Sequence, residues 1–246
     1  MKRLGVALVL LLALLMSVLG AGASHAAVDQ PPDLRMRKPS GFYIQTAGTE
    51  RRLRFTTVVA NYGPGVFHVR ADRPNTATAR MSVVQRVAQD DGSPRTVLTD
   101  SYAFWGGDGH EHWHIDRLQE FTIRRVDDND SGVTGPIVGR GAKIGFCFYD
   151  NTKINLALPG APQAPRYTGC GVKTALGVTM GLSVGWGDTY GANLNYQWIK
   201  INGLKDGKYR IHVTADPRNQ FVEGNETNNR SFTTIRIRGN AVTVLG

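Results

Sequence analysis

Short runs of β-branched and aromatic residues alternate with turn-forming residues along most of the chain. The clearest alternation lies near the C-terminus, where single polar residues separate Tyr209, Ile211 and Val213. Successive side chains of a strand point to opposite faces, so this period places one face of a strand inward and the other in solvent. The pattern predicts an all-β fold, a β-sandwich, rather than alternating strands and helices.

Further strands are expected where such a run is bounded by turn-forming residues. They cover residues 53–60, 81–89, 95–99, 118–126, 143–149, 197–202 and 230–238. The Asp-Asp-Gly-Ser stretch at 90–93 predicts a hairpin, and the acidic stretch 127–132 predicts a solvated turn. We expect 197–202 and 230–238 to flank the strand at 209–213.

The segment 151–195 differs from the rest of the chain, because it contains many Gly, Pro and Asn residues and shows little periodicity. Long irregular segments inside compact domains are often functional. We therefore expect this segment to form long irregular loops over the sandwich, and these loops to carry the functional site.

The N-terminal residues have the pattern of an export signal. Two basic residues precede an apolar run over 4–19, and small residues follow it. Residues 1–27 are therefore interpreted as a signal peptide, cleaved after Ala26 or Ala27, and residues 28–246 as one secreted domain. A retained membrane anchor is the alternative, because the apolar run approaches the roughly 20 residues that span a bilayer.

Charge and cysteine content narrow the class of protein. The net charge is +9, but the basic residues form only short clusters, so no nucleic-acid partner is expected. Weak association with anionic envelope polymers fits such a charge better. The two cysteines, Cys147 and Cys170, predict one disulfide in an oxidising compartment.

A run of three histidines carries the strongest chemical signal. His110, His112 and His114 alternate with other residues, which places all three on one face of an extended chain. In a straight strand the Cα atoms of His110 and His114 would lie about 13 Å apart, near the limit at which both rings reach one ion. The segment should therefore bend. Glycines just upstream provide the flexibility. Neutral imidazoles suit copper and zinc, and the run alone does not choose between them; surface histidines on an edge strand are the non-functional alternative.

Several motifs together resemble the catalytic domain of the lysyl oxidase family. They are the histidine run, Asp-Thr-Tyr-Gly at 188–191, Lys-Ile-Gly-Phe-Cys at 143–147 and the stretch 223–229. The likeness extends upstream to 32–34 and 53–55. It implies a single lysyl oxidase-like catalytic domain over residues 28–246.

The resemblance also implies the residues of the site. It makes copper the favoured metal, held by His110, His112 and His114. It implies that Lys143 and Tyr190 form a lysine tyrosylquinone cofactor. Taken separately, Lys143 would be a lysine with a buried stem at a strand end, and Tyr190 a packed loop residue.

The activity implied by the resemblance is oxidation of a primary amine to an aldehyde, with release of ammonia and hydrogen peroxide. The expected partners are a lysine-containing peptide or protein, or a small primary amine, together with molecular oxygen. The reaction needs a base that titrates near the working pH and removes the α-proton of the amine. Asp188 is the candidate; an aspartate that only stabilises a turn is an equal alternative.

Two other functions compete with amine oxidation. The stretch 216–229 also resembles the last hairpin of bacterial immunoglobulin-like adhesion domains, which would make the chain a secreted metal-binding or adhesion-type β-sandwich without catalysis. Three histidines and a bound water would also suit a zinc hydrolase. The animal enzymes carry cysteines where Gly109 and Tyr196 stand here, and the spacing from the last histidine to 119–121 is longer here than in those enzymes. Substrate choice is therefore the property that the resemblance indicates least.

Overall fold

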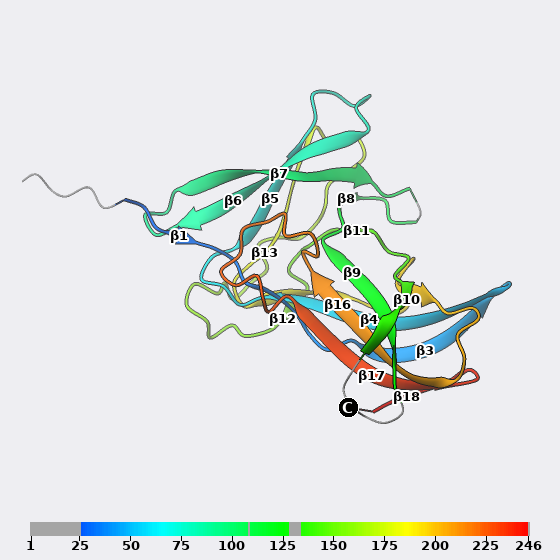
Figure 1. The fold of residues 1–246 in the computed structure, drawn as a ribbon. Coiled ribbons are helices and arrows are strands. Elements are labelled where there is room, and N and C mark those ends of the chain that lie inside the picture. The colour runs from blue at the N-terminus through cyan, green and yellow to red at the C-terminus, as the bar shows by residue number, and fades with distance from the viewer. Residues whose placement is uncertain (1–25, 108, 128–133, 246) are drawn as a thin grey trace, which may run out of the picture.

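The computed structural model describes residues 26–107, 109–127 and 134–245. Every regular element in these residues is a β-strand, and the strands form three antiparallel sheets (Figure 1). The predicted all-β fold is confirmed. No helix in this part of the chain is long and apolar enough to cross a membrane. Residues 1–25 of the predicted export signal lie outside the described residues.

The first sheet has seven strands and forms the upper part of Figure 1. In spatial order its strands are β11 (Gly145–Phe146), β8 (Trp113–Asp116), β7 (Pro94–Trp105), β6 (Arg80–Gln89), β5 (Phe67–Asp72) and β13 (Gly177–Leu182), and β1 (Asp29–Gln30) pairs with β6. The predicted hairpin is confirmed, since β6 and β7 pair with Val84 opposite Leu98.

The other two sheets lie face to face. One contains β10 (Thr134–Arg140), β9 (Gln119–Val126), β16 (Gly207–Ala215), β17 (Arg230–Arg238) and β18 (Ala241–Val244). The other contains β12 (Thr152–Lys153), β14 (Trp186–Tyr190), β4 (Glu50–Asn61) and β15 (Trp198–Lys200), with β2 (Leu34–Met36) and β3 (Ser40–Ala47) also on β4.

The core between these two sheets is apolar, as the alternating pattern requires. Tyr209, Ile211 and Val213 of β16 are buried, and the residues between them are partly exposed. Phe55 of β4 packs edge to face on Phe121 of β9, with ring centroids 5.3 Å apart. Edge-to-face packing is the favoured arrangement of aromatic pairs. This pair of sheets is the predicted β-sandwich.

Two strand predictions were right about the presence of a strand, but one was wrong about its length and the other about its neighbour. In 143–149 only Gly145 and Phe146 form a strand, although Phe148 is fully buried; an apolar run is buried whether its backbone is regular or not. In 197–202 the strand β15 pairs with β4, and β9 takes the expected place beside β16.

The segment 151–195 is more regular than expected, because it contains β12, β13 and β14. The glycines of these strands explain why the sequence did not indicate them. A Cβ at Gly181 would collide with the backbone oxygen of Phe67, and one at Gly187 would lie 2.7 Å from that of Val59. Glycine is needed where two strands approach so closely, and it removes the side-chain pattern from the sequence. Strand β10 was not expected, and the predicted turn at 127–132 lies outside the described residues from position 128 onward.

Candidate active site

A tight turn brings the three histidines together. His114 lies on β8, whereas His110 and His112 precede the strand. The backbone N–H of His112 donates to the carbonyl of His110 (2.8 Å), and that of Gly106 donates to the carbonyl of His112 (3.0 Å). Gly109 has φ of +89°, a conformation that favours glycine. The bend that the spacing predicted is present.

The three imidazole rings lie close together, near the spacing of rings that share a metal ion. Their centroids lie 5.7 Å (His110 and His112), 5.6 Å (His110 and His114) and 4.5 Å (His112 and His114) apart. With metal–nitrogen bonds of about 2 Å, rings on a shared ion have centroids roughly 5 Å apart. Within the described residues no group of His, Cys, Asp or Glu already meets the distances of a bound ion, so metal binding requires the rings to turn slightly toward a common point.

His114 is the most enclosed of the three. It is buried, and its Nε2 has no hydrogen-bond partner within the described residues. Such a buried polar atom is costly unless a ligand satisfies it. Burial, followed by the nearby charge of Lys143, lowers the pKa of His114 to about 2. The ring is therefore neutral, which is the form that binds a metal.

Two glycines make room for this ring. A Cβ at Gly106 would lie 2.5 Å from Nδ1 of His114, and one at Gly145 would lie 2.8 Å from its Cβ and 2.5 Å from Phe104 Cζ. Cβ atoms do not approach other heavy atoms so closely. Any side chain at either position would therefore displace the imidazole of His114.

Lys143 and Tyr190 meet in the core beside the histidines. Lys143 precedes β11 and is buried, with its Nζ 5.6 Å from the centroid of the Tyr190 ring and 5.3 Å from that of Phe146. Tyr190 ends β14, where it lies opposite Thr57 of β4. The two residues are 47 positions apart in the chain, so the fold brings them together.

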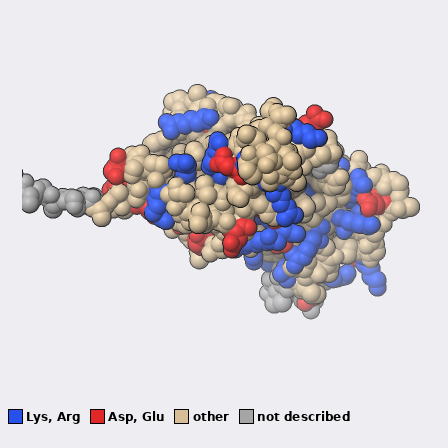
Figure 2. Space-filling model, turned by 90° about the horizontal axis from the view of Figure 1, so that it is seen from above, with Lys and Arg blue, Asp and Glu red and all other residues tan. Residues whose placement is uncertain are grey.

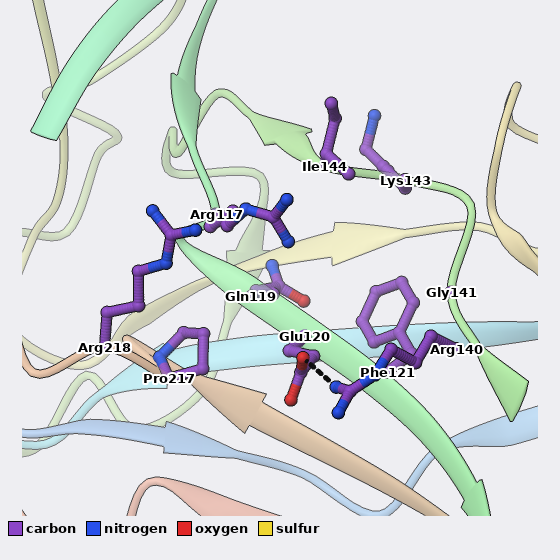
Figure 3. A pocket seen from close by; sticks show the side chains of 10 residues that line it. All are labelled: Arg117, Gln119, Glu120, Phe121, Arg140, Gly141, Lys143, Ile144, Pro217 and Arg218. Carbon is purple, nitrogen blue, oxygen red and sulfur yellow. Dashed lines mark hydrogen bonds and ion pairs between the residues drawn. The ribbon is translucent and has the colours of Figure 1, made fainter. Parts of the chain in front are cut away.

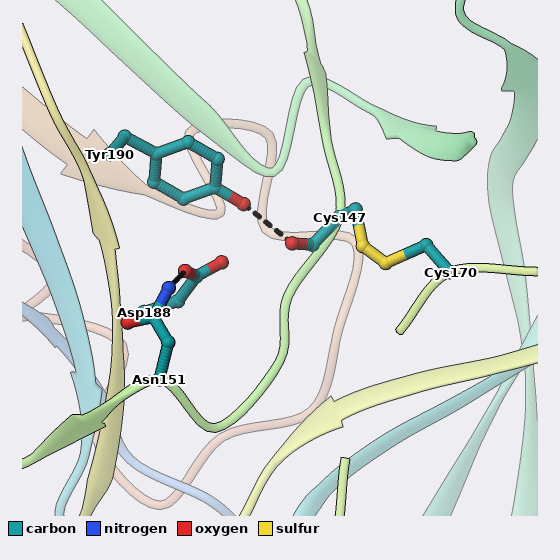
Figure 4. The surroundings of a disulfide bond; sticks show 5 residues. All are labelled: Cys147, Asn151, Cys170, Asp188 and Tyr190. Carbon is teal, nitrogen blue, oxygen red and sulfur yellow. Dashed lines mark hydrogen bonds between the residues drawn. A yellow bond between two sulfur atoms is a disulfide. The ribbon is translucent and has the colours of Figure 1, made fainter. Parts of the chain in front are cut away.

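The hydroxyl of Tyr190 is held in one direction. It donates to the backbone carbonyl of Cys147 at 2.7 Å (Figure 4). The ring packs edge to face on Phe146, with centroids 5.3 Å apart. Burial, followed by the nearby Asp188 carboxyl, raises the pKa of Tyr190 well above its usual value. The phenol is therefore fully protonated at neutral pH.

Asp188 lies two residues before Tyr190 and is completely buried. Its Oδ1 accepts a hydrogen bond of 2.5 Å from Asn151 Nδ2, and its Oδ2 has no partner among the described residues. Burial raises the pKa of Asp188 to about 7, with the polar neighbours Tyr190 and Asn151 offsetting part of the rise. A carboxyl with this pKa can gain or lose a proton at neutral pH.

The predicted disulfide between Cys147 and Cys170 is present (Figure 4). Its two residues also position the site. The carbonyl of Cys147 accepts from Tyr190, and that of Cys170 accepts from the N–H of Trp113, which lies between two of the histidines (3.0 Å). The bridge thus ties the tyrosine to the histidine turn, a role that its sequence did not indicate.

A cavity of about 220 Å³ has both His114 and Lys143 in its lining. It is lined by Phe104, His114, Ala142, Lys143, Ile144, Gly145 and Tyr196. Sequence reasoning missed Phe104 as a site residue, and it noted Tyr196 only as a replacement for a cysteine. The cavity is large enough for an amine side chain, and its aromatic walls suit the methylene groups that precede the amine.

The fold and the site define an all-β protein in which a histidine turn adjoins a buried lysine–tyrosine pair. The chain belongs to the lysyl oxidase family, because the sequence profile described as Lysyl oxidase matches residues 76–246. The matched range contains all the candidate site residues. The likeness noted at 32–34 and 53–55 lies upstream of it.

Individual relatives match over parts of their length. Human lysyl oxidase homolog 1 is 32% identical over 120 residues, which are 49% of this chain and 18% of the relative. Human protein-lysine 6-oxidase is 30% identical over 156 residues, 63% of this chain and 33% of the relative. Lysyl oxidase homolog 2A of Danio rerio is 25% identical over 148 residues, which are 60% of this chain and 17% of the relative. The chain thus spans a third or less of these relatives.

Proposed function

We propose that this chain is a secreted, copper-dependent amine oxidase that converts the primary amine of lysine side chains, or of similar small amines, to an aldehyde. His110, His112 and His114 would hold the copper, and Lys143 and Tyr190 would form the lysine tyrosylquinone. Copper and the quinone would supply the redox chemistry, with O2 as the final oxidant and ammonia and hydrogen peroxide as products. The names of the relatives and the donor set of the histidine turn support this proposal.

The position of Lys143 above the ring of Tyr190 carries the proposal. Crosslinking requires the lysine nitrogen to reach a ring carbon, and the Nζ lies 5.6 Å from the ring centroid. The same Lys143 lines a cavity with His114. A lysine and a tyrosine with purely structural roles would not need a histidine turn beside them.

The residues of the chain would handle the protons of the reaction. The amine of Lys143 must be uncharged to attack the oxidised ring, so it must give up its proton before the crosslink forms. Asp188 would take the α-proton of the substrate amine, because its raised pKa of about 7 suits proton acceptance near neutral pH. The Cys147 carbonyl would fix the orientation of the tyrosine ring before the crosslink forms.

Copper content tests the metal assignment directly. We expect one copper per chain in the parent protein and almost none in His112→Ala, measured by elemental analysis after dialysis. His212→Ala is the matched control, because His212 lies on β16, away from the turn, and should leave copper content unchanged. Full copper occupancy in His112→Ala would refute the assignment.

A further inference from the structure

A second cavity, of about 480 Å³, also has Lys143 and Ile144 in its lining (Figure 3). Figure 3 shows Lys143 and Ile144 along its upper edge, Arg117 and Arg218 on one side, and Arg140 paired with Glu120 below. The first cavity also contains Lys143 and Ile144 in its lining. The two cavities therefore adjoin, with the Lys143–Ile144 segment as their shared wall.

The second cavity has an excess of positive charge. Arg140 is paired with Glu120 at 2.5 Å. The buried Asp116 accepts a hydrogen bond of 3.3 Å from Arg218, but it lies 3.8 Å from Arg117, which is beyond hydrogen-bond length. Asp116 therefore attracts the Arg117 guanidinium without occupying its N–H donors. The guanidinium groups of Arg117, Arg140 and Arg218 thus outnumber the two carboxylates near them, those of Glu120 and Asp116.

Unusual backbone conformations gather around the two cavities. Among the described residues, the non-glycine residues with positive φ are Arg117 (53°), Tyr196 (61°), Asp216 (35°) and Asn219 (52°). Arg117 and Tyr196 line the cavities, and Asp216 and Asn219 bracket the loop that carries Arg218. Such conformations cost energy and persist where the surrounding structure enforces them, often at binding sites.

Hydrogen bonds hold these conformations in place. The N–H of Arg117 donates to the carbonyl of Ile144 at 2.7 Å, and that of Asp216 donates to the carbonyl of Leu118 at 2.9 Å. The carboxylate of Asp216 accepts from the N–H groups of Gln220 and Phe221. The backbone that carries Arg117 and Arg218 is thus fixed relative to the Lys143–Ile144 wall.

We propose that this arginine-lined cavity binds a carboxylate of the amine substrate, so that the enzyme favours a lysine with a carboxylate nearby. The inference rests on the proposed function. A substrate would place its amine in the cavity beside His114 and Lys143 and cross the half-exposed Ile144 to place its carboxylate at Arg117 and Arg218. Guanidinium groups bind carboxylates with paired hydrogen bonds, which lysines cannot reproduce.

The geometry also limits the strength of the effect. The side chains of Arg117 and Arg218 are 43% and 49% exposed, so water and salt screen their charges. A charge-assisted hydrogen bond in such a place corresponds to about a tenfold change in affinity at low salt. The preference should weaken as salt is added.

Three lysine dipeptides of equal length test the proposal with the copper-loaded protein. The first is acetylated lysyl-glutamate amide, the second is acetylated lysyl-glutamine amide, and the third is acetylated lysyl-glutamine with a free C-terminus. Peroxide release gives kcat and KM for each. The same three peptides with norleucine in place of lysine cannot be oxidised, and their binding is measured by calorimetry. The first and third peptides distinguish a side-chain carboxylate from a terminal one.

We expect at least one carboxylate peptide to have about a tenfold lower KM than the amide, with similar kcat, and its norleucine form to bind about tenfold more tightly. Arg218→Gln and Arg117→Gln should abolish the difference in KM and in binding between the carboxylate peptides and the uncharged peptide. Arg238→Gln, at the exposed end of β17, removes one charge elsewhere and should keep the preference.

Equal KM values and equal binding for all three peptides in the parent protein would overturn the proposal. So would a preference that survives both arginine substitutions. If no peptide yields peroxide but the norleucine peptides still show the carboxylate preference, the anion site stands and the proposed oxidase function fails.

Discussion

The Nζ of Lys143 lies 5.6 Å from the centroid of the Tyr190 ring, inside a core that also holds the buried Asp188. The two residues come from different sheets, since Lys143 precedes β11 and Tyr190 ends β14. Their contact is therefore a product of the tertiary fold and not of local sequence.

Gly106→Ala should impair copper binding without unfolding the protein. The added Cβ would lie 2.5 Å from Nδ1 of His114 and 2.8 Å from the backbone oxygen of His110, so the ring or the turn must shift. Gly107→Ala is the control, because a Cβ there meets nothing within 4 Å. Copper affinity and thermal unfolding of the copper-free proteins separate the two effects. Unchanged copper affinity in Gly106→Ala would argue against His114 as a ligand.

Tyr190→Phe should keep its copper and lose amine-dependent peroxide release entirely. The substitution removes the phenol that is to be oxidised and leaves the imidazoles untouched. It also leaves the buried Cys147 carbonyl without its donor, which should cost about 1–3 kcal/mol of stability. Lys143→Ala should likewise bind copper, but it cannot form the crosslink. Copper content, visible absorbance and peroxide release are measured for both variants, and undiminished oxidase activity in Tyr190→Phe would disprove the mechanism.

The pH profile of the reaction should follow the carboxyl of Asp188. A base must be ionised to accept a proton, and burial raises the pKa of Asp188 from 3.8 to about 7. The value of kcat/KM should therefore fall about tenfold for each pH unit below this pKa. Asp188→Asn should have low activity and lack this dependence, and a parent profile that is flat between pH 5 and about 8 would exclude Asp188 as the base.

The same carboxyl should lower the stability of the fold as the pH rises, whereas it should raise the activity. The pKa of Asp188 is higher in the folded protein than in the unfolded chain. Between about pH 4 and pH 7 the folded state therefore binds more protons than the unfolded state does. The contribution of Asp188 to the free energy of unfolding is greatest below that window and is lost as the pH rises through about 7. Relative to the parent, Asp188→Asn should therefore gain stability as the pH increases, which denaturant unfolding at several pH values measures.

Removing the disulfide should weaken both the fold and the site. By the chain-entropy model, a bridge of this separation contributes about 3 kcal/mol. The variant with both Cys147→Ala and Cys170→Ala should therefore unfold at a lower denaturant concentration. It should also bind copper less tightly, because the carbonyl of Cys170 holds the N–H of Trp113 in the histidine turn. Free thiols in the parent protein under denaturing, non-reducing conditions would contradict the bridge.

The sequence indicated the regular parts of the fold where one face of a strand is buried and the other exposed. Tyr209, Ile211 and Val213 are such a case, and their strand was predicted correctly. Strand β14 was missed because four of its five residues are buried and Gly187 lacks a side chain, so it shows no alternation. The run 143–149 had the composition of a strand, but burial of Phe146 and Phe148 does not require a regular backbone.

The candidate site was predictable in part for a similar reason. Local spacing indicated the histidine turn and its bend, and the motif resemblance indicated Lys143 and Tyr190. No local pattern could indicate that Cys147 would orient Tyr190, or that Arg117 and Arg218 would meet beside Asp116. Cys147 and Tyr190 are 43 positions apart, and Asp116 and Arg218 are about 100 positions apart. Only the packing of the sheets brings these residues together.

The covalent state of Lys143 and Tyr190 tests the central claim most directly. The copper-loaded protein, aerated and digested, is mapped by mass spectrometry. We predict one crosslinked peptide that contains both residues, absent from Tyr190→Phe and from His112→Ala prepared in the same way. Separate, unmodified Lys143 and Tyr190 peptides from fully copper-loaded, aerated protein would contradict the account.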